Sequence, residues 1–244
     1  MENEKYENEL KNVSAIIHLA AVVGSNNKEL NFKTNVEGTR RLIESAKKNK
    51  IKRIIFVSTI SASYSKRNNY AESKLQAEKL IHESGMAATV IRPNLIIGKN
   101  SPQLKKISDM TNLPVIPVVG SGKKLIQPIS VDQLSQILLK TIENEKIISH
   151  TITVSGSEAL TFNKFLDKIT MSNTGKTKIK IHMPIFVCNI LAALLEIGLG
   201  EKAPINKGQI ILINQDSMSS FNHIKQLYDL KEISLTNILE GAKK

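Results

Sequence analysis

Three short apolar runs, separated by segments with helical periodicity, constrain the fold of this chain more than any other feature. The runs lie at residues 13–20, 51–58 and 88–98. Each has the length of a strand and lacks the alternation of a strand with one face in water, so each is expected to be buried on both faces. Helical patterns at 35–50 and 68–85 separate them. Buried strands that alternate with helices imply parallel crossovers, and the predicted fold class is therefore α/β.

The second helical segment carries signals at both of its ends. Asn69 is the expected N-cap, with Glu72 three residues later, and Gly85 is expected to end the helix. Leu80 and Ile81 should face the core. The first helical segment has apolar residues at the same kind of spacing: Val36, Leu42, Ile43 and Ala46.

The carboxyl-terminal half has a different texture. Residues 99–127 are rich in proline and glycine and are expected to be mainly loop. Beyond residue 175, one short strand and several short helices follow one another. The predicted organisation is a sheet domain at residues 1–170 and a smaller, mainly helical lobe at 171–244.

The chain is strongly basic, with a net charge of +12. Such a charge raises nucleic acid, an anionic membrane surface or a phosphorylated ligand as partners. However, only five of the 34 basic residues are arginine and aromatic residues make up only 4%. Sites that read bases or stack single strands use arginine and aromatic side chains, so no nucleic-acid partner is expected.

A single cysteine, Cys188, excludes an internal disulfide and favours a reducing compartment, so the cytoplasm is the expected location. The polar, acidic amino terminus does not resemble a signal peptide. The longest apolar run, residues 184–200, contains Asn189 and Glu196 and is shorter than the roughly 20 residues of a spanning helix. No transmembrane segment is expected, and core packing of the helix at 185–197 is favoured over a membrane-surface role.

Tyr70 and Lys74 form the most informative pair in the chain. Positions four apart share one face of a helix, so the ammonium group can lie near the phenol. A nearby positive charge would lower the phenol pKa towards the working pH, as a general acid/base requires. The same lysine could donate to the ribose of a nicotinamide cofactor. The alternative is an ordinary pair of residues on a solvated helix face.

Six segments in order give the chain a resemblance to the extended and atypical short-chain dehydrogenase/reductase superfamily. They are HLAAVVG (18–24), NVEGTRRLIESA (35–46), IKRIIFVSTISA (51–62), YAESK (70–74), IRPNLIIG (91–98) and QPISVDQLSQIL (127–138). The superfamily includes the NAD-dependent epimerases and dehydratases of nucleotide sugars. Within it, the chain looks most like the atypical branch of NDUFA9-like NAD(P)-binding proteins of complex I. The resemblance implies a partial Rossmann-type domain at 1–170 with a small carboxyl-terminal lobe.

The resemblance also assigns site residues. Tyr70 and Lys74 would be the catalytic pair, with Thr59 as a candidate for polarising the substrate carbonyl. The cofactor, NAD or NADP, would contact Tyr70, Lys74 and a further set: Ala20, Ala21, Asn35, Ser58, Pro93, Asn94 and Leu95. No residues stand at metal-ligand spacing, so no metal is expected, and His18 is expected to be a core histidine with a satisfied hydrogen bond.

Two departures from the family pattern stand out. Ile60 occupies the position where related epimerases commonly carry a hydroxyl group, so Thr59 or Ser61 would have to replace it. The glycine-rich phosphate turn and, by the family's order, the first three strands have no counterpart. The strand at 13–20 would then be an exposed edge, open to a second copy or a partner chain. An amino-terminally incomplete chain, through truncation or a start-site error, is expected; a genuinely shortened protein is the alternative.

The expected function is that of an NAD(P)-dependent oxidoreductase or epimerase with a small-molecule substrate, for which a nucleotide sugar is one candidate. The alternative is a noncatalytic NAD(P)-binding or complex-assembly protein. Ile60 and the absent phosphate turn favour the alternative.

Overall fold

The computed structural model describes residues 9–200 and 203–243 and divides into two compact units. Unit 1 comprises Met1–Arg92 and Ile137–Thr153, and unit 2 comprises Pro93–Gln136 and Val154–Lys244. The units are interleaved along the sequence, whereas the domains expected from the sequence, 1–170 and 171–244, are contiguous.

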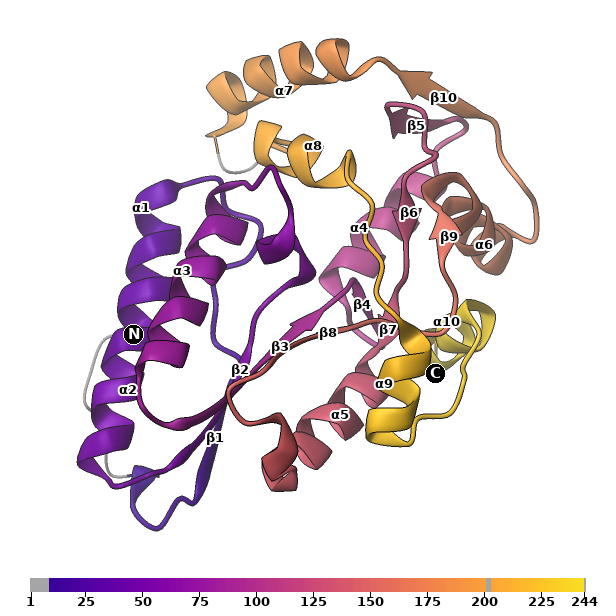
Figure 1. Cartoon of the computed structure of the whole chain (residues 1–244). Helices are drawn as coiled ribbons and strands as arrows, with labels where there is room; N and C mark the ends of the chain where they lie inside the picture. Colours follow the sequence, from indigo (N-terminus) through magenta and orange to yellow (C-terminus); the bar gives the residue numbers. More distant parts are fainter. Residues whose placement is uncertain (1–8, 201–202, 244) are drawn as a thin grey trace. The chain divides into compact units, whose positions relative to one another are not determined.

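Unit 1 is built on a parallel sheet, which confirms the predicted α/β class (Figure 1). The strand order is β1-β2-β3-β8, with Ile16 opposite Ile54 and Phe56 opposite Val90. Every residue of β2 is buried, as predicted, whereas β1 is only half-buried before His18 because it is the edge of the described sheet. The four strands are β1 (Ala15–His18), β2 (Arg53–Val57), β3 (Ala87–Pro93) and β8 (Thr151–Val154).

Helices α2 and α3 pack on this sheet and form its core. Leu42 and Ile43 of α2 meet Ala77 and Ile81 of α3 over Ile54 and its neighbours. The elements of this unit are α1 (Lys28–Asn31), the π-helical η2 (Phe32–Glu37), α2 (Gly38–Lys48), the 3-10 turn η3 (Ile60–Ser63), α3 (Asn69–Glu83) and η4 (Glu145–Ile147). Helix α5 (Val131–Glu143) begins in unit 2 and ends in unit 1.

The N-cap predicted for α3 is wrong by one residue. Asn68, not Asn69, has extended backbone angles and accepts a hydrogen bond from the N–H of Ala71 at 2.9 Å. Asn69 is the first helical residue and donates instead to the carbonyl of Asn26. Gly85 follows the helix with φ of 72°, a left-handed conformation that favours glycine, so the predicted end is confirmed.

Unit 2 holds short strand pairs covered by helices, and one expectation about it is wrong. The segment at 99–127, expected to be mainly loop, contains helix α4 (Pro102–Thr111) and strands β5 (Ile116–Val119) and β6 (Leu125–Ile126). The other elements are β4 (Ile96–Ile97), β7 (Ile129–Ser130), β9 (Leu160–Thr161), α6 (Phe162–Thr174), β10 (Lys180–Met183), α7 (Ile185–Leu199), α8 (Lys207–Ile213), α9 (Phe221–Tyr228) and α10 (Leu235–Lys243).

Helix α7 does not pack as expected. Only Cys188 and Ala192 are buried, against Ile210 of α8, and the Cys188 thiol is free. The prediction that this helix packs in the core is wrong for most of its surface, because six large apolar side chains are exposed: Phe186, Ile190, Leu191, Leu194, Ile197 and Leu199. Within the described residues, no helix is long and apolar enough to cross a membrane.

Candidate cofactor and catalytic site

The candidate site of unit 1 lies where α3 passes the carboxyl end of β2. Lys74 is 1% exposed, and its Nζ donates to the carbonyl of Val57, the last residue of β2, at 2.7 Å. The same nitrogen lies 4.0 Å from the centre of the Phe56 ring. Burial lowers the pKa of Lys74 to about 7, against the opposing effect of Glu78. A buried amine is therefore held at the end of the sheet where ligands of parallel α/β proteins bind.

Tyr70 reaches the segment that follows β2, where its hydroxyl forms a side-chain hydrogen bond with Thr59. Burial raises the pKa of Tyr70 to about 12, which the bond to Thr59 only partly offsets. This corrects the expectation that Lys74 lowers the phenol pKa. The ammonium group is directed at the Val57 carbonyl and is itself easily neutralised, so desolvation of the phenol dominates.

Thr59, and not Ile60, supplies the hydroxyl group next to Tyr70. Thr59 is the N-cap of η3, because its Oγ1 accepts from the N–H of Ser61. The same Oγ1 lies 3.0 Å from Oγ of Ser61. Ile60 is buried at 7% exposure. Thr59 thus lies beside Tyr70 and Ser61 lies beside Thr59, and the role of either hydroxyl group at a substrate stays a prediction.

Ser58 provides the strongest sign that the site accepts a ligand. Its N–H donates to the carbonyl of Ile91 at 2.7 Å, but its buried Oγ has no hydrogen-bond partner. Only Asn31 Oδ1 and Ser219 Oγ share this condition among the side chains that the structure describes. An unpaired buried hydroxyl costs free energy unless a bound group satisfies it. The residues present therefore fit a ribose hydroxyl of a nicotinamide cofactor.

Asn35 ties the segment after β1 to helix α3. Its Oδ1 accepts from the N–H of Val22 at 2.8 Å, and its Nδ2 donates to Oγ of Ser73 at 2.9 Å. Ser73 in turn donates to the carbonyl of Tyr70 at 2.8 Å. Both Asn35 and Ser73 are fully enclosed, at 1% and 0% exposure. Asn35 thus links the segment after β1 to helix α3, and its role at the site stays a prediction.

Ala20 and Ala21 lie in the segment that Asn35 holds. Ala20 is exposed and Ala21 is half-buried, and neither belongs to a helix or strand. Their role in contacting the cofactor stays a prediction.

Two further contacts of helix α3, made by Ser73 and Glu78, were not predicted from the sequence. Ser73 directly precedes Lys74, but no spacing rule distinguishes a buried serine on a helix from a solvated one. Glu78 forms an ion pair with Arg92 that includes a 2.8 Å bond from Nε to Oε1. Glu78 could have been predicted to lie near Lys74, because residues four apart share one face of a helix.

His18 is a core residue with its hydrogen bond satisfied, as expected. It is 4% exposed, and its Nε2 lies 2.9 Å from Oγ1 of Thr39. Thr39 donates to the carbonyl of Asn35, so its hydroxyl accepts the imidazole proton. Burial, with a smaller effect of Lys74, lowers the pKa of His18 to about 4. In the described part of the chain, no group of three or more His, Cys, Asp or Glu side chains is arranged to hold a metal.

Pro93, Asn94 and Leu95 belong to unit 2, whereas the other expected site residues belong to unit 1. The N–H of Asn94 donates to the carbonyl of Val154, and its side chain bonds to Ser217. The N–H of Leu95 donates to Oδ1 of Asn94. Both N–H groups are engaged inside the unit, so the expected backbone contact with a carboxamide stays a prediction that would rest on carbonyl groups.

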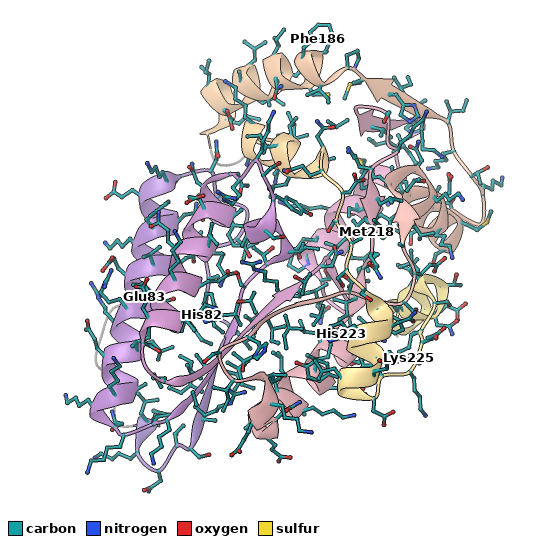
Figure 2. All side chains as sticks on the ribbon, viewed as in Figure 1. His82, Glu83, Phe186, Met218, His223 and Lys225 are labelled. Atoms are coloured by element: carbon teal, nitrogen blue, oxygen red, sulfur yellow. The ribbon has the colours of Figure 1, made fainter. Side chains whose placement is uncertain are left out.

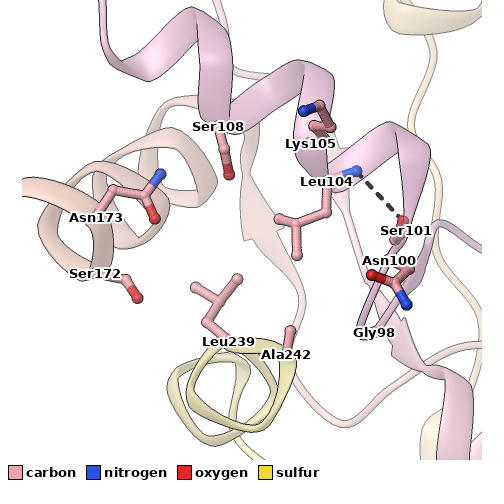
Figure 3. Close-up of a pocket in the computed structure, with 10 residues that line it drawn as sticks. All are labelled: Gly98, Asn100, Ser101, Leu104, Lys105, Ser108, Ser172, Asn173, Leu239 and Ala242. Carbon is pink, nitrogen blue, oxygen red and sulfur yellow. Dashed lines mark hydrogen bonds between the residues drawn. The ribbon is translucent and has the colours of Figure 1, made fainter. Parts of the chain in front are cut away.

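A pocket of about 200 Å³ lies among α4, α6 and α10 of unit 2 (Figure 3). Figure 3 shows Ser101 at its edge accepting from the N–H of Leu104, the N-cap bond of α4. Lys105 is exposed, and the remaining lining is serine, asparagine and aliphatic side chains. No expected site residue lines this pocket.

The model of the NAD dependent epimerase/dehydratase family matches residues 2–154, more than half of the chain. The match covers the segments that hold Ser58, Thr59, Tyr70 and Lys74. It agrees with the expected cofactor class.

Two similar curated proteins are named for different roles. The chain is 26% identical over 239 residues to the mitochondrial NADH dehydrogenase [ubiquinone] 1 alpha subcomplex subunit 9 of Dictyostelium discoideum, covering 96% of this chain and 64% of that protein. It is 26% identical over 206 residues to the decarboxylating sterol-4-alpha-carboxylate 3-dehydrogenase of Homo sapiens, covering 73% of this chain and 55% of that protein. The chain therefore spans less than two thirds of the length of each.

Solved structures agree on the fold. The UDP-glucuronic acid 4-epimerase of Bacillus cereus, in complex with UDP-glucuronic acid and NAD, matches with a TM-score of 0.75 at 18% identity, over 98% of this chain and 77% of that one. MoeE5 in complex with UDP-glucose and NAD matches with a TM-score of 0.74 at 16% identity, over 97% and 80%. With the family match, these likenesses lead to one conclusion: the chain belongs to the NAD dependent epimerase/dehydratase family.

Proposed function

We propose that the site of unit 1 binds the nicotinamide half of NAD or NADP, and that the natural protein is an oxidoreductase or epimerase in which Tyr70 exchanges the proton. One observation carries this proposal. The Tyr70–Thr59 hydrogen bond and the buried Lys74 amine both lie at the carboxyl end of β2, beside a buried Ser58 hydroxyl that has no partner.

Lys74 and Ser58 are the residues that would hold the cofactor. An ammonium group has three donors, and the Val57 carbonyl takes one of them. Ribose hydroxyls of the cofactor can accept from the same nitrogen. A ribose hydroxyl can also pair with Ser58 Oγ and so supply the hydrogen-bond partner that this atom lacks. Bound NAD or NADP would supply hydride acceptance or return.

Tyr70 would act on the substrate oxygen. With a pKa of about 12, its phenol is protonated near neutral pH, so the free protein presents an acid. Thr59 orients that hydroxyl and is the second hydroxyl available to a substrate carbonyl. This arrangement favours proton donation to a carbonyl group that is being reduced.

The substrate is a small molecule with a carbonyl or carbinol group, and a nucleotide sugar is one candidate. The B. cereus and MoeE5 structures contain UDP-sugars with NAD, whereas the human relative is named for a sterol carboxylate. A cytoplasmic location is part of the proposal, since a lone cysteine suits a reducing compartment. A second copy or partner chain would cover the free edge of β1.

The second candidate function is that of a noncatalytic NAD(P)-binding or assembly protein. Ile60 in place of a hydroxyl residue and the raised pKa of Tyr70 favour it. The Dictyostelium relative, which is named as a subunit of a respiratory complex, points the same way.

The test uses the natural gene product. NADH and NADPH are titrated by fluorescence, and turnover is followed with UDP-glucose, UDP-glucuronic acid and a 3-oxo ester. Tyr70→Phe should lower kcat/KM by about 10²–10⁴-fold without changing cofactor affinity, because only the proton-transfer group is removed. Ser58→Ala should weaken NADH binding.

Three outcomes separate the candidates. Equal turnover by Tyr70→Phe and the wild type would remove Tyr70 from the mechanism. NADH binding without turnover on any substrate would favour the assembly protein. Absence of NADH and NADPH binding by the natural gene product would contradict both.

A further inference from the structure

Helix α7 exposes a continuous apolar face. Phe186, Ile190, Leu194 and Ile197 recur at intervals of three and four residues, so they lie on one side of the helix. Their exposed fractions are 67%, 57%, 61% and 84%. Figure 2 shows Phe186 on the side of α7 that faces away from α8. We call these four residues the α7 face.

The opposite side of α7 is already in contact with protein. Cys188 and Ala192 pack against Ile210 of α8, with Val119 and Met183 at the margin of the cluster. The polar residues Asn189 and Glu196 occupy a narrow strip between the two sides. A helix that is apolar over most of its circumference requires a second apolar environment.

The net charge of the chain favours an anionic surface over a second copy of the chain as the partner of the α7 face. Each chain carries a net charge of +12, so two copies repel one another, whereas an anionic surface attracts the chain. Residues 176–207 contain five lysines and two glutamates. Lys176 and Lys207, on either side of α7, are exposed, while Lys178 and Lys180 bond to Thr111 and Asp167.

A low charge content does not count against a lipid surface here. A free interfacial helix needs a charged face because its reverse side is in water. The reverse side of α7 lies on α8 instead, and the basic residues come from the flanking segments. We propose that the α7 face docks this protein on the surface of an anionic lipid bilayer, with Phe186 and its neighbours in the acyl boundary and the flanking lysines at the headgroups.

Vesicle flotation tests this proposal with the full chain. Vesicles of phosphatidylcholine alone are compared with vesicles of equimolar phosphatidylcholine and phosphatidylglycerol. The wild type should bind the anionic vesicles, and added salt should weaken this binding. The variant Phe186→Gln/Ile190→Gln/Ile197→Gln should bind about tenfold more weakly or not at all, because the buried apolar area is lost.

A matched control replaces three exposed apolar residues outside α7. Leu139→Gln/Met171→Gln/Met218→Gln removes side chains that are 63%, 49% and 46% exposed, and its vesicle binding should equal that of the wild type. Circular dichroism checks that both variants are folded. Ile197→Gln alone serves if the α7 triple variant is not.

Charge is tested separately. Lys176→Gln/Lys207→Gln should weaken binding to anionic vesicles while leaving the α7 face intact. The proposal is overturned if the wild type does not bind anionic vesicles, or if the α7 variant binds as well as the control. A wild type that sediments as a dimer, with a monomeric α7 variant and no vesicle binding, would assign the face to a second copy instead.

Discussion

Helices α3 and α7 have the same length, 15 residues, but opposite relations between polarity and burial. Helix α3 buries Ser73, Lys74 and Glu78, and each has a hydrogen-bond or ion-pair partner. Helix α7 buries only Cys188 and Ala192 and exposes most of its large apolar residues. Polar burial and apolar exposure are both costly for a helix whose only role is packing, so each helix points to a ligand or a surface.

The largest expected difference in stability is between the same substitution at two isoleucines, one in each helix. Ile81 of α3 is 0% exposed and Ile197 of α7 is 84% exposed. Ile81→Ala should lower the free energy of unfolding by about 2–5 kcal/mol because it opens a cavity under the sheet. Ile197→Ala should change it by less than about 0.5 kcal/mol. Urea unfolding followed by circular dichroism measures both, and equal losses would mean that the α7 face is covered in the isolated protein.

The buried lysine of α3 should make stability depend on pH. The pKa of Lys74 is about 7 in the folded chain and 10.5 for an unperturbed lysine, so between these values the unfolded state binds a proton that the folded state lacks. The free energy of unfolding should therefore rise from pH 7 to 9, by up to about 1.4 kcal/mol per pH unit, and the cost of burial is fully present below pH 7.

Lys74→Met should remove this rise. Lys79→Met, which replaces an exposed lysine of the same helix, should retain the wild-type slope. His18 and Tyr70 do not interfere, because the shift of His18 acts between about pH 4 and 6.5 and that of Tyr70 between about pH 10 and 12. An unchanged slope in Lys74→Met would show that the amine is charged and solvated near neutral pH.

The smallest effect concerns the start of α3. Asn68→Ala removes the N-cap hydrogen bond to Ala71 and should cost about 1 kcal/mol of stability. Asn69→Ala loses only an exposed bond to the Asn26 carbonyl and should cost less. Thermal unfolding of the two variants ranks them, and the reverse order would restore Asn69 as the cap.

Much of unit 1 was predictable, for a simple reason. Its strands are continuous apolar runs and its helices repeat apolar residues at helical spacing, so Leu42 and Ile43 of α2 and Ile81 of α3 were placed in the core. Helix α4 was missed because Pro102 was interpreted as loop punctuation. Ser101 caps that helix and Pro102 occupies its first turn, where a missing N–H costs nothing.

The candidate site was predictable as a set of residues but not as chemistry. The motif order identified Ser58, Thr59, Tyr70 and Lys74, and the structure brings Tyr70 to Thr59 and Lys74 to the end of β2. The direction of the phenol pKa shift was wrong. It depends on where the Lys74 amine is directed and how much water surrounds Tyr70, and neither quantity is contained in a spacing of four residues.

The sequence by itself determined the parallel α/β class, the family and the helix that carries the candidate pair, because periodicity and motif order are local properties of the chain. Only the tertiary structure decided that the Ser58 hydroxyl lacks a partner, that burial lowers the pKa of Lys74 and that an apolar side of α7 is exposed. Burial is the reason: it depends on which segments meet in space, and a helix pattern shows that a face is apolar without showing what covers it.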